Sequence, residues 1–200
     1  MDKRTLFMTL MLAIAIGGGA ALLKDAWIRR NDPSRNQNVY DHMGGDFSLV
    51  HKSGPFSLEK LKGKPSILYF GFTSCPDVCP LALNTLMGSL DSIDPEVHKK
   101  INKVFISVDY KRDDKDKVDE YSRYFATDFV GLTGEKKEIE RVTKNYGVHF
   151  SFVELKDSKL GYTVDHTSRF FILNKQGKLV ASFTDVKNDP DFKKTLIEVL

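Results

Sequence analysis

One short stretch decides the fold: SILYFGFTSCPDVCP, which occupies residues 66–80. Its first seven residues carry no charge and are mostly apolar, which predicts a central strand buried on both faces. The chain's two cysteines, Cys75 and Cys79, follow that strand at once. Pro80 suits the first turn of a helix, where its missing N–H would have no partner. Both thiols are therefore expected at the carboxyl end of a strand, where open α/β sheets bind ligands.

Strand and helix patterns alternate on both sides of this stretch. Further strands are predicted at 46–50, 56–58, 103–109, 128–132, 168–174 and 178–183, and helices around 83–93, 118–125, 139–146 and 192–199. This alternation implies a partly parallel sheet covered on both faces, and the turn signal Gln176-Gly177 predicts a closing antiparallel hairpin. The predicted class is α/β, a thioredoxin-like fold with a central mixed sheet flanked by helices.

Composition limits the classes of function. The chain has 200 residues, of which 41% are hydrophobic and 28% charged, and its net charge is +3. These values suit one globular domain with an appendage, because the apolar fraction supports a core. The basic residues are scattered, so the clustered positive surface that nucleic-acid binding requires is not expected. A single close pair of cysteines predicts a redox or metal site rather than a disulfide-rich scaffold.

The amino-terminal stretch is expected to lie outside the fold. Residues 5–23 carry no charge and follow Lys3 and Arg4, and roughly 20 apolar residues suffice to cross a bilayer. We favour an uncleaved membrane anchor at 1–24 over a cleaved signal peptide, because no polar cleavage region follows the small residues. A linker at 25–43 and a globular domain at 44–200 complete the predicted organisation. Basic residues also follow the span, so their count does not fix its orientation.

The spacing of the cysteines allows two chemistries. Residues four apart on a helical turn point the same way, so Cys75 and Cys79 can direct both sulfurs at one point. The helix amino end is expected to lower the pKa of the Cys79 thiol. Oxidoreductases of the thioredoxin type have two residues between their cysteines, whereas this chain has three. A disulfide remains open, although so small a loop would stabilise the fold little.

A metal held by two thiolates needs a further ligand. The chain has five histidines. His42, His51 and His98 occupy predicted tether, turn and helix-end positions, and His149 lies near a predicted strand or loop. His166 immediately precedes the strand predicted at 169–173, in the loop expected to face the cysteines. Asp165 is either an acceptor that orients His166 or only a turn residue. Two cysteines and one histidine suit copper or zinc, and ligand chemistry alone leaves both open.

The segment FGFTSCPDVCP at 70–80 resembles the signature of the Sco/SenC family of copper-binding assembly factors. Other blocks match at similar spacing, so that the resemblance extends over roughly residues 44–185: they are 54–58, 63–64, 105–109, 112–113, 131–134 and 164–168. The resemblance implies a thioredoxin-like fold, an amino-terminal membrane anchor and copper ligands at Cys75, Cys79 and His166. One departure is Tyr110, where the family usually has proline.

The resemblance also implies a function and a location. Family members deliver copper to the binuclear copper centre of cytochrome c oxidase, or reduce it, so the copper-bearing oxidase subunit is the expected partner. The expected role is that of a copper chaperone rather than an enzyme. The domain is expected on the periplasmic side of a bacterial inner membrane, with the mitochondrial intermembrane space as the alternative. The rival function is a thiol–disulfide oxidoreductase, in which Cys75 and Cys79 act as attacking and resolving thiols.

Overall fold

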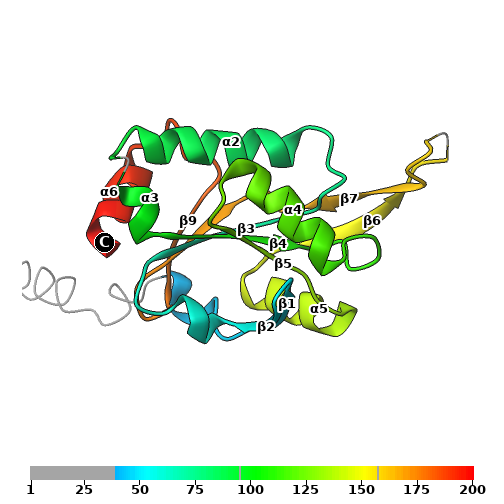
Figure 1. Cartoon of the computed structure of the whole chain (residues 1–200), viewed down its shortest axis with the longest axis horizontal. Helices are drawn as coiled ribbons and strands as arrows, with labels where there is room; N and C mark the ends of the chain where they lie inside the picture. The colour runs from blue at the N-terminus through cyan, green and yellow to red at the C-terminus, as the bar shows by residue number, and fades with distance from the viewer. Residues whose placement is uncertain (1–38, 95, 157) are drawn as a thin grey trace, which may run out of the picture. The chain divides into compact units, whose positions relative to one another are not determined.

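A computed structural model describes residues 39–94, 96–156 and 158–200 (Figure 1). Contacts divide the chain into two units, 1–39 and 40–200, and nearly all described residues belong to the second. The predicted anchor at 1–24 and most of the predicted linker lie outside the described residues. Within the described stretches, no helix has the length and apolar character needed to cross a membrane.

Nine strands form three sheets in this unit. The central sheet has the order β5-β4-β3-β8-β9, with strands β3 (Ser66–Gly71), β4 (Asn102–Ser107), β5 (Phe129–Leu132), β8 (Phe170–Leu173) and β9 (Leu179–Phe183). The pairs β3–β4 and β4–β5 are parallel, whereas β3–β8 and β8–β9 are antiparallel. Two separate hairpins are β1 (Ser48–His51) with β2 (Gly54–Ser57), and β6 (Phe150–Glu154) with β7 (Tyr162–His166). The predicted mixed sheet is thus confirmed.

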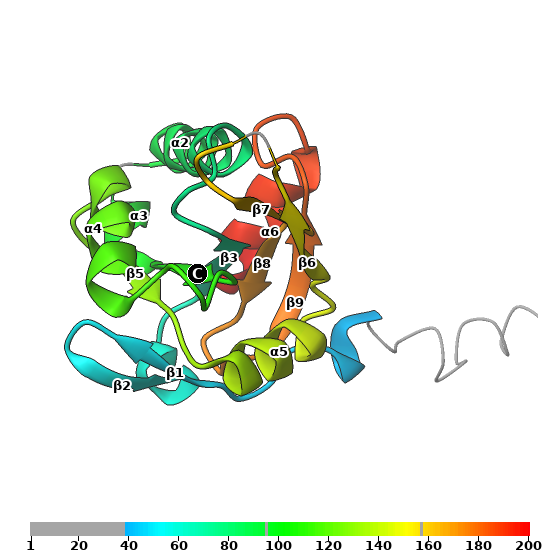
Figure 2. The same cartoon turned by 90° about the vertical axis from the view of Figure 1, so that its right-hand side faces the viewer.

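Helices cover both faces of the central sheet (Figures 1 and 2). The helical elements are η2 (Val39–His42), η3 (Leu58–Leu61), α2 (Val78–Asp91), α3 (Val97–Lys100), α4 (Lys115–Phe125), α5 (Lys136–Asn145) and α6 (Pro190–Val199). Helices α2 and α4 lie over one face, and α5 lies over the other together with the β1–β2 hairpin. The four long helices agree with the predicted apolar spacings, while the short α3 was not predicted.

The central strand β3 positions the cysteines. All six of its residues are buried, as expected for a strand with neighbours on both sides and helices on both faces. Tyr69 and Phe105, which are paired in register, turn toward α4, where Phe105 packs against Tyr121. Phe70 turns the other way and packs against Tyr146 at the end of α5. Because both faces are filled, the end of β3 has little freedom to move.

Helix starts also follow local sequence. The Asp114 carboxylate caps α4 by accepting hydrogen bonds from the Asp116 and Lys117 amides, which satisfies amide groups that have no partner within the helix. Asp189 caps α6 in the same way, and Pro190 occupies its first turn. These caps fix where the helices begin relative to the strand ends.

The main difference from the sequence prediction is the β6–β7 hairpin. Beyond the strand or loop expected near His149, the sequence pattern predicts no strand between α5 and β8, yet this segment forms two antiparallel strands that project away from the central sheet (Figure 1). His166 was expected in a loop entering the next strand. It is instead the last residue of β7, paired in register with Phe150. Each of these strands is only five residues long and mostly half-buried, so its alternation is a weak signal.

Candidate metal and thiol centre

The two cysteines occupy different local structures. Helix α2 begins at Val78, after Asp77, so Cys79 lies in its first turn. Cys75 lies in the preceding loop, and the expectation that both cysteines share one helical turn is wrong. The loop nevertheless brings them together, because the Cys79 amide donates a hydrogen bond to the Cys75 sulfur at 3.4 Å. Both are free thiols.

Cys79 is fully buried, whereas Cys75 is half-buried. The close approach of Gly71 helps to bury Cys79. A Cβ atom added at Gly71 would lie 2.9 Å from the Cys79 sulfur and 2.9 Å from the Phe105 ring. A larger residue at the end of β3 would therefore have to displace the sulfur or the ring.

The two thiols have opposite pKa shifts. The pKa of Cys75 is lowered to about 5, chiefly because the Cys79 side chain donates a hydrogen bond to it, with further help from the Asp77 and Cys79 amides. The pKa of Cys79 is raised by that same hydrogen bond and by burial. The prediction that the helix amino end lowers the pKa of Cys79 is therefore wrong. Cys75 is the thiolate, and Cys79 keeps its proton.

His166 reaches the buried thiol. Its Nε2 atom lies 3.6 Å from the Cys79 sulfur. Its Nδ1 atom lies 3.1 Å from the Thr167 carbonyl oxygen, which only accepts, so Nδ1 carries a proton and Nε2 is left with its lone pair in the neutral ring. The group that orients His166 is thus the Thr167 carbonyl, whereas Asp165 is exposed.

Aromatic rings enclose the imidazole. The Phe72 and Tyr69 rings meet the His166 ring edge to face, with centroid separations of 5.9 and 6.3 Å. The Tyr69 hydroxyl lies 2.8 Å from the Ser168 hydroxyl, and burial raises the Tyr69 pKa. No sequence signal predicts this role of Tyr69, because it lies inside an apolar run.

A cleft opens onto the site. Its volume is about 240 Å³, and its lining includes Phe72, Cys75, Asp77 and His166. A larger cleft of about 780 Å³ runs along α4 and meets the cysteine loop only at Thr73. The smaller cleft is the relevant one, because it exposes the thiolate and the imidazole together.

The other four histidines are not part of this site. His51 and His98 each lie beside an aspartate, His42 belongs to η2, and His149 is exposed just before β6. Across the described stretches, no three side chains of His, Cys, Asp or Glu together have metal-holding geometry. Among the three predicted ligands, the Cys79 sulfur and the His166 Nε2 atom are therefore the pair whose separation suits a shared metal ion.

Two features define the class of protein: a mixed sheet flanked by helices, and a dithiol–imidazole site at the end of its central strand. This is a thioredoxin-like protein with a candidate metal site. The chain belongs to the SCO1/SenC family, whose pattern matches residues 35–200. A SCO2-like protein of Rickettsia conorii is 36% identical over an alignment of 180 positions, which covers 87% of each chain.

Solved structures agree with this assignment. ScoI of Bradyrhizobium japonicum with copper bound is 34% identical, with a TM-score of 0.69 over 79% of this chain and 99% of that one. ScoI of Arabidopsis thaliana with copper bound is 36% identical, with a TM-score of 0.70 over 78% of this chain and 98% of that one. The predicted family and its thioredoxin-like fold are thus confirmed.

Proposed function

We propose that this protein binds copper through Cys75, Cys79 and His166 and delivers it to the binuclear copper centre of cytochrome c oxidase during assembly. The copper-bearing subunit of the oxidase is the proposed partner. Copper is the cargo in this proposal, so it must be held tightly enough to carry and loosely enough to release.

The distance from the Cys79 sulfur to the His166 Nε2 atom is the observation that carries this proposal. Metal–sulfur and metal–nitrogen bonds of about 2.3 and 2.0 Å, the values for zinc, place two ligand atoms of one ion about 3.5–3.7 Å apart at angles near 110–120°. The 3.6 Å separation agrees with that range. Because Nδ1 contacts the Thr167 carbonyl, Nε2 is the ring nitrogen that faces the sulfur.

Two further facts support copper as the metal. Thiolates favour Cu(I), zinc and iron–sulfur centres, and two cysteines are too few for a four-cysteine cluster. Among these metals, copper is the one bound in the related ScoI structures of Bradyrhizobium japonicum and Arabidopsis thaliana. Cu(I) with two thiolates and one imidazole is therefore the proposed bound form.

The state of the thiols suits both capture and release. Cys75 is already a thiolate and faces the cleft, so it can meet copper first. Cys79 must lose its proton to become a ligand, and metal binding is therefore coupled to proton release. In delivery, the partner's ligands would replace Cys75 first, because Cys75 is accessible and Cys79 is buried.

We place the protein at a membrane, with residues 1–24 as its anchor, 25–43 as a linker and the domain from 44 onward on the periplasmic side of a bacterial inner membrane. This placement rests on the uncharged residues 5–23 and on the family resemblance. The alternative is the mitochondrial inner membrane, with the domain in the intermembrane space.

A second candidate function is reduction of a disulfide in the partner's copper site. The observation in its favour is the opposite protonation of the thiols: the half-buried Cys75 thiolate can attack, and the buried Cys79 can resolve. Attack by Cys75 forms a mixed disulfide and releases one partner thiolate. Cys79, once deprotonated, then attacks Cys75, releases the second thiolate and leaves a Cys75–Cys79 disulfide, so two electrons pass to the partner.

Cu(I) titration of the reduced, metal-free chain separates the two functions. We expect His166→Ala to weaken Cu(I) binding by about 100-fold or more, since loss of even an indirect supporting group typically costs 10- to 100-fold. His149→Ala, which removes an exposed imidazole, should leave the affinity unchanged. Equal affinity of wild type and His166→Ala, together with retained disulfide reduction, would favour the oxidoreductase.

A further inference from the structure

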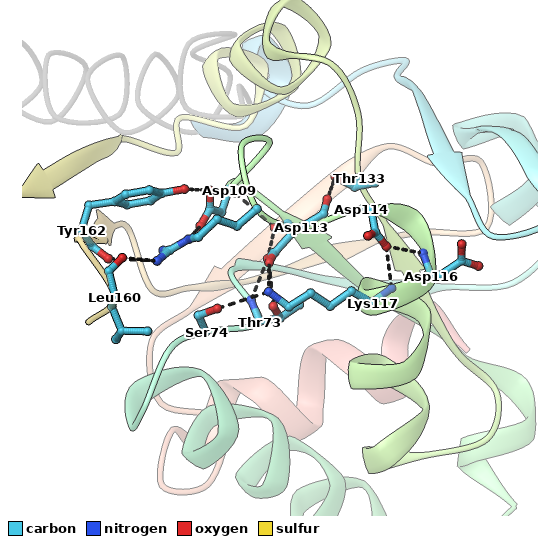
Figure 3. A network of polar contacts seen from close by, with 12 residues as sticks. Thr73, Ser74, Asp109, Asp113, Asp114, Asp116, Lys117, Thr133, Leu160 and Tyr162 are labelled. Atoms are coloured by element: carbon cyan, nitrogen blue, oxygen red, sulfur yellow. Dashed lines mark hydrogen bonds and ion pairs between the residues drawn. The ribbon is translucent and has the colours of Figure 1, made fainter. Parts of the chain in front are cut away.

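A single turn between β4 and α4 contacts both halves of the site. Residues 109–113, here named the bracing turn, are held tightly because the Asp109 carbonyl accepts hydrogen bonds from the amides of both Arg112 and Asp113. Figure 3 shows the turn between Tyr162 on one side and Thr73 and Ser74 on the other. None of the proposed copper ligands lies in this turn.

One side of the bracing turn holds the cysteine loop. The buried Asp113 carboxylate accepts hydrogen bonds from the Thr73 amide at 2.8 Å and the Thr73 hydroxyl at 2.6 Å. It also accepts from the Ser107 hydroxyl at 2.7 Å and from Lys117 at 3.0 Å. Lys117 reaches the Ser74 hydroxyl as well, at 3.3 Å. These contacts fix the loop two residues before Cys75.

The other side holds the strand that carries His166. The Arg112 guanidinium donates to the Asp109 carboxylate at 2.6 Å and to the Tyr162 and Leu160 carbonyls at 3.0 and 3.3 Å. It also lies over the Tyr162 ring, with its central carbon 3.6 Å from the centroid. The Tyr162 hydroxyl completes the arrangement by donating to Asp109 at 2.8 Å.

The β6–β7 hairpin depends on these contacts with the bracing turn, because neither of its strands pairs with the central sheet. Tyr162 and His166 are four residues apart in β7, so they lie on the same face of the strand. Fixing the start of β7 through Tyr162 therefore constrains where His166 lies at its end. Arginine suits this task, since its planar fork bonds several acceptors in fixed directions.

We propose that Arg112 and Asp113 are positioning residues, and that the bracing turn sets the distance between His166 and the cysteine sulfurs. Adjacent residues of one rigid turn hold the histidine strand and the cysteine loop, so the two halves of the site keep a fixed separation. This inference rests on the proposed copper site for its consequence. Its physical basis, a fixed separation before metal binds, can be tested without metal.

Three variants test the two sides of the turn. Arg112→Lys keeps the charge but loses the fork, and Tyr162→Phe loses only the hydroxyl bond to Asp109. Both should weaken Cu(I) binding by about 10- to 100-fold, the usual effect of removing a group that orients a ligand. Thr73→Val should instead slow alkylation of Cys75 at pH 6 several-fold, because a loosened loop weakens the amide bonds to the thiolate. Thr73→Ser should restore the alkylation rate.

Matched controls remove the same groups elsewhere. Arg123→Lys and Tyr124→Phe change side chains of α4, and Tyr124 is 83% exposed, so neither should change affinity. A double variant separates positioning from general stability. Because Arg112 acts through His166, adding Arg112→Lys to His166→Ala should cause no further loss of affinity. An additional tenfold loss in the double variant would overturn the proposal.

A metal-free measurement separates failure of this proposal from failure of the copper function. Amide hydrogen exchange in β7 should be several-fold faster in Arg112→Lys and Tyr162→Phe than in wild type, and unchanged in Thr73→Val. If wild type binds no Cu(I) but exchange responds in this way, the copper function fails and the positioning role stands. Unchanged exchange in both variants overturns the positioning role, whatever the metal result.

Discussion

The cysteine loop and the β6–β7 hairpin supply the two halves of one site, but the fold holds them in different ways. The loop continues a strand that is buried along its whole length and paired on both sides. The hairpin pairs only with itself and projects from the domain. Its Val153 and Leu160 side chains are 43% and 48% exposed. The core therefore fixes the sulfurs, whereas the imidazole depends on a few side-chain contacts.

This difference has a consequence for the proposed release of copper. Moving the hairpin separates His166 from Cys79 without breaking a hydrogen bond of the central sheet, because the two sheets share no strand. Tyr110, the departure from the family pattern, packs edge to face on Phe152 of the hairpin at 5.3 Å. The bracing turn therefore holds the hairpin through an aromatic contact of Tyr110 as well as through its polar contacts.

The largest contrast between the two regions is expected from truncating a side chain in each. Leu68→Ala in β3 removes a fully buried side chain and should lower the free energy of unfolding by about 2–5 kcal/mol. Val153→Ala in β6 should lower it by less than about 0.5 kcal/mol, as at most exposed positions. Urea unfolding of the two variants measures both effects. Similar losses would show that the hairpin is as much a part of the core as β3.

A smaller effect is expected from filling the space behind the buried thiol. Gly71→Ala should destabilise the fold by about 1–3 kcal/mol, because its Cβ would meet the Cys79 sulfur and the Phe105 ring at 2.9 Å. Gly88→Ala is the matched control. No atom lies within 4 Å of its added Cβ, and alanine in a helix interior should stabilise by up to about 1 kcal/mol. Equal stability of Gly71→Ala and wild type would mean that the sulfur is free to move.

The hairpin should also open more easily than the central sheet. Amides in β6 and β7 should exchange hydrogen at least about tenfold faster than those in β3 and β8, which corresponds to an opening free energy lower by about 1.4 kcal/mol. Hydrogen exchange of the metal-free chain at neutral pH checks this directly. Equal exchange rates in the two sheets would show that the hairpin carrying His166 is held as firmly as the sheet that positions the cysteines.

The smallest effect on the fold, although a clear one on reactivity, is expected from pH. Because the pKa of Cys75 is lowered to about 5, its alkylation by iodoacetamide should be half-maximal near pH 5, while buried Cys79 stays unreactive. The thiolate favours the folded state, so its contribution to stability is complete above the ordinary thiol pKa of about 8.5 and is lost as pH falls through 5. Cys79→Ala should move the alkylation midpoint upward, since it removes the main stabilising hydrogen bond. An unmoved midpoint would mean that the Cys79 thiol does not stabilise the Cys75 thiolate.

Much of the fold follows from local patterns that the sequence displays openly. The apolar run of β3 predicts a buried strand, and the spacing of Leu83, Leu86 and Leu90 predicts a helix with one buried face. Such patterns predict burial, and these residues are buried in the structure. The β6–β7 hairpin was missed because its alternating runs are only five residues long, and its aromatic residues pack on one another and on Tyr110 rather than in the central core. The thiol pKa values were misassigned for a related reason. A helix start predicts a low pKa, but burial and the bond to Cys75 depend on neighbours from other elements.

The sequence by itself determined the family, the central strand, and the two cysteines at its carboxyl end, because each depends on residues that are close along the chain. The tertiary structure alone decided which thiol carries the charge, because burial of Cys79 depends on the core packed around it. It also decided which nitrogen of His166 faces the sulfur, and how Arg112 and Asp113 link the cysteine loop to β7. These last two properties depend on distances of a few ångströms between residues far apart along the chain, as in the Thr73–Asp113 and Cys79–His166 contacts. Periodicity and spacing carry no record of such distances, since they describe each element separately.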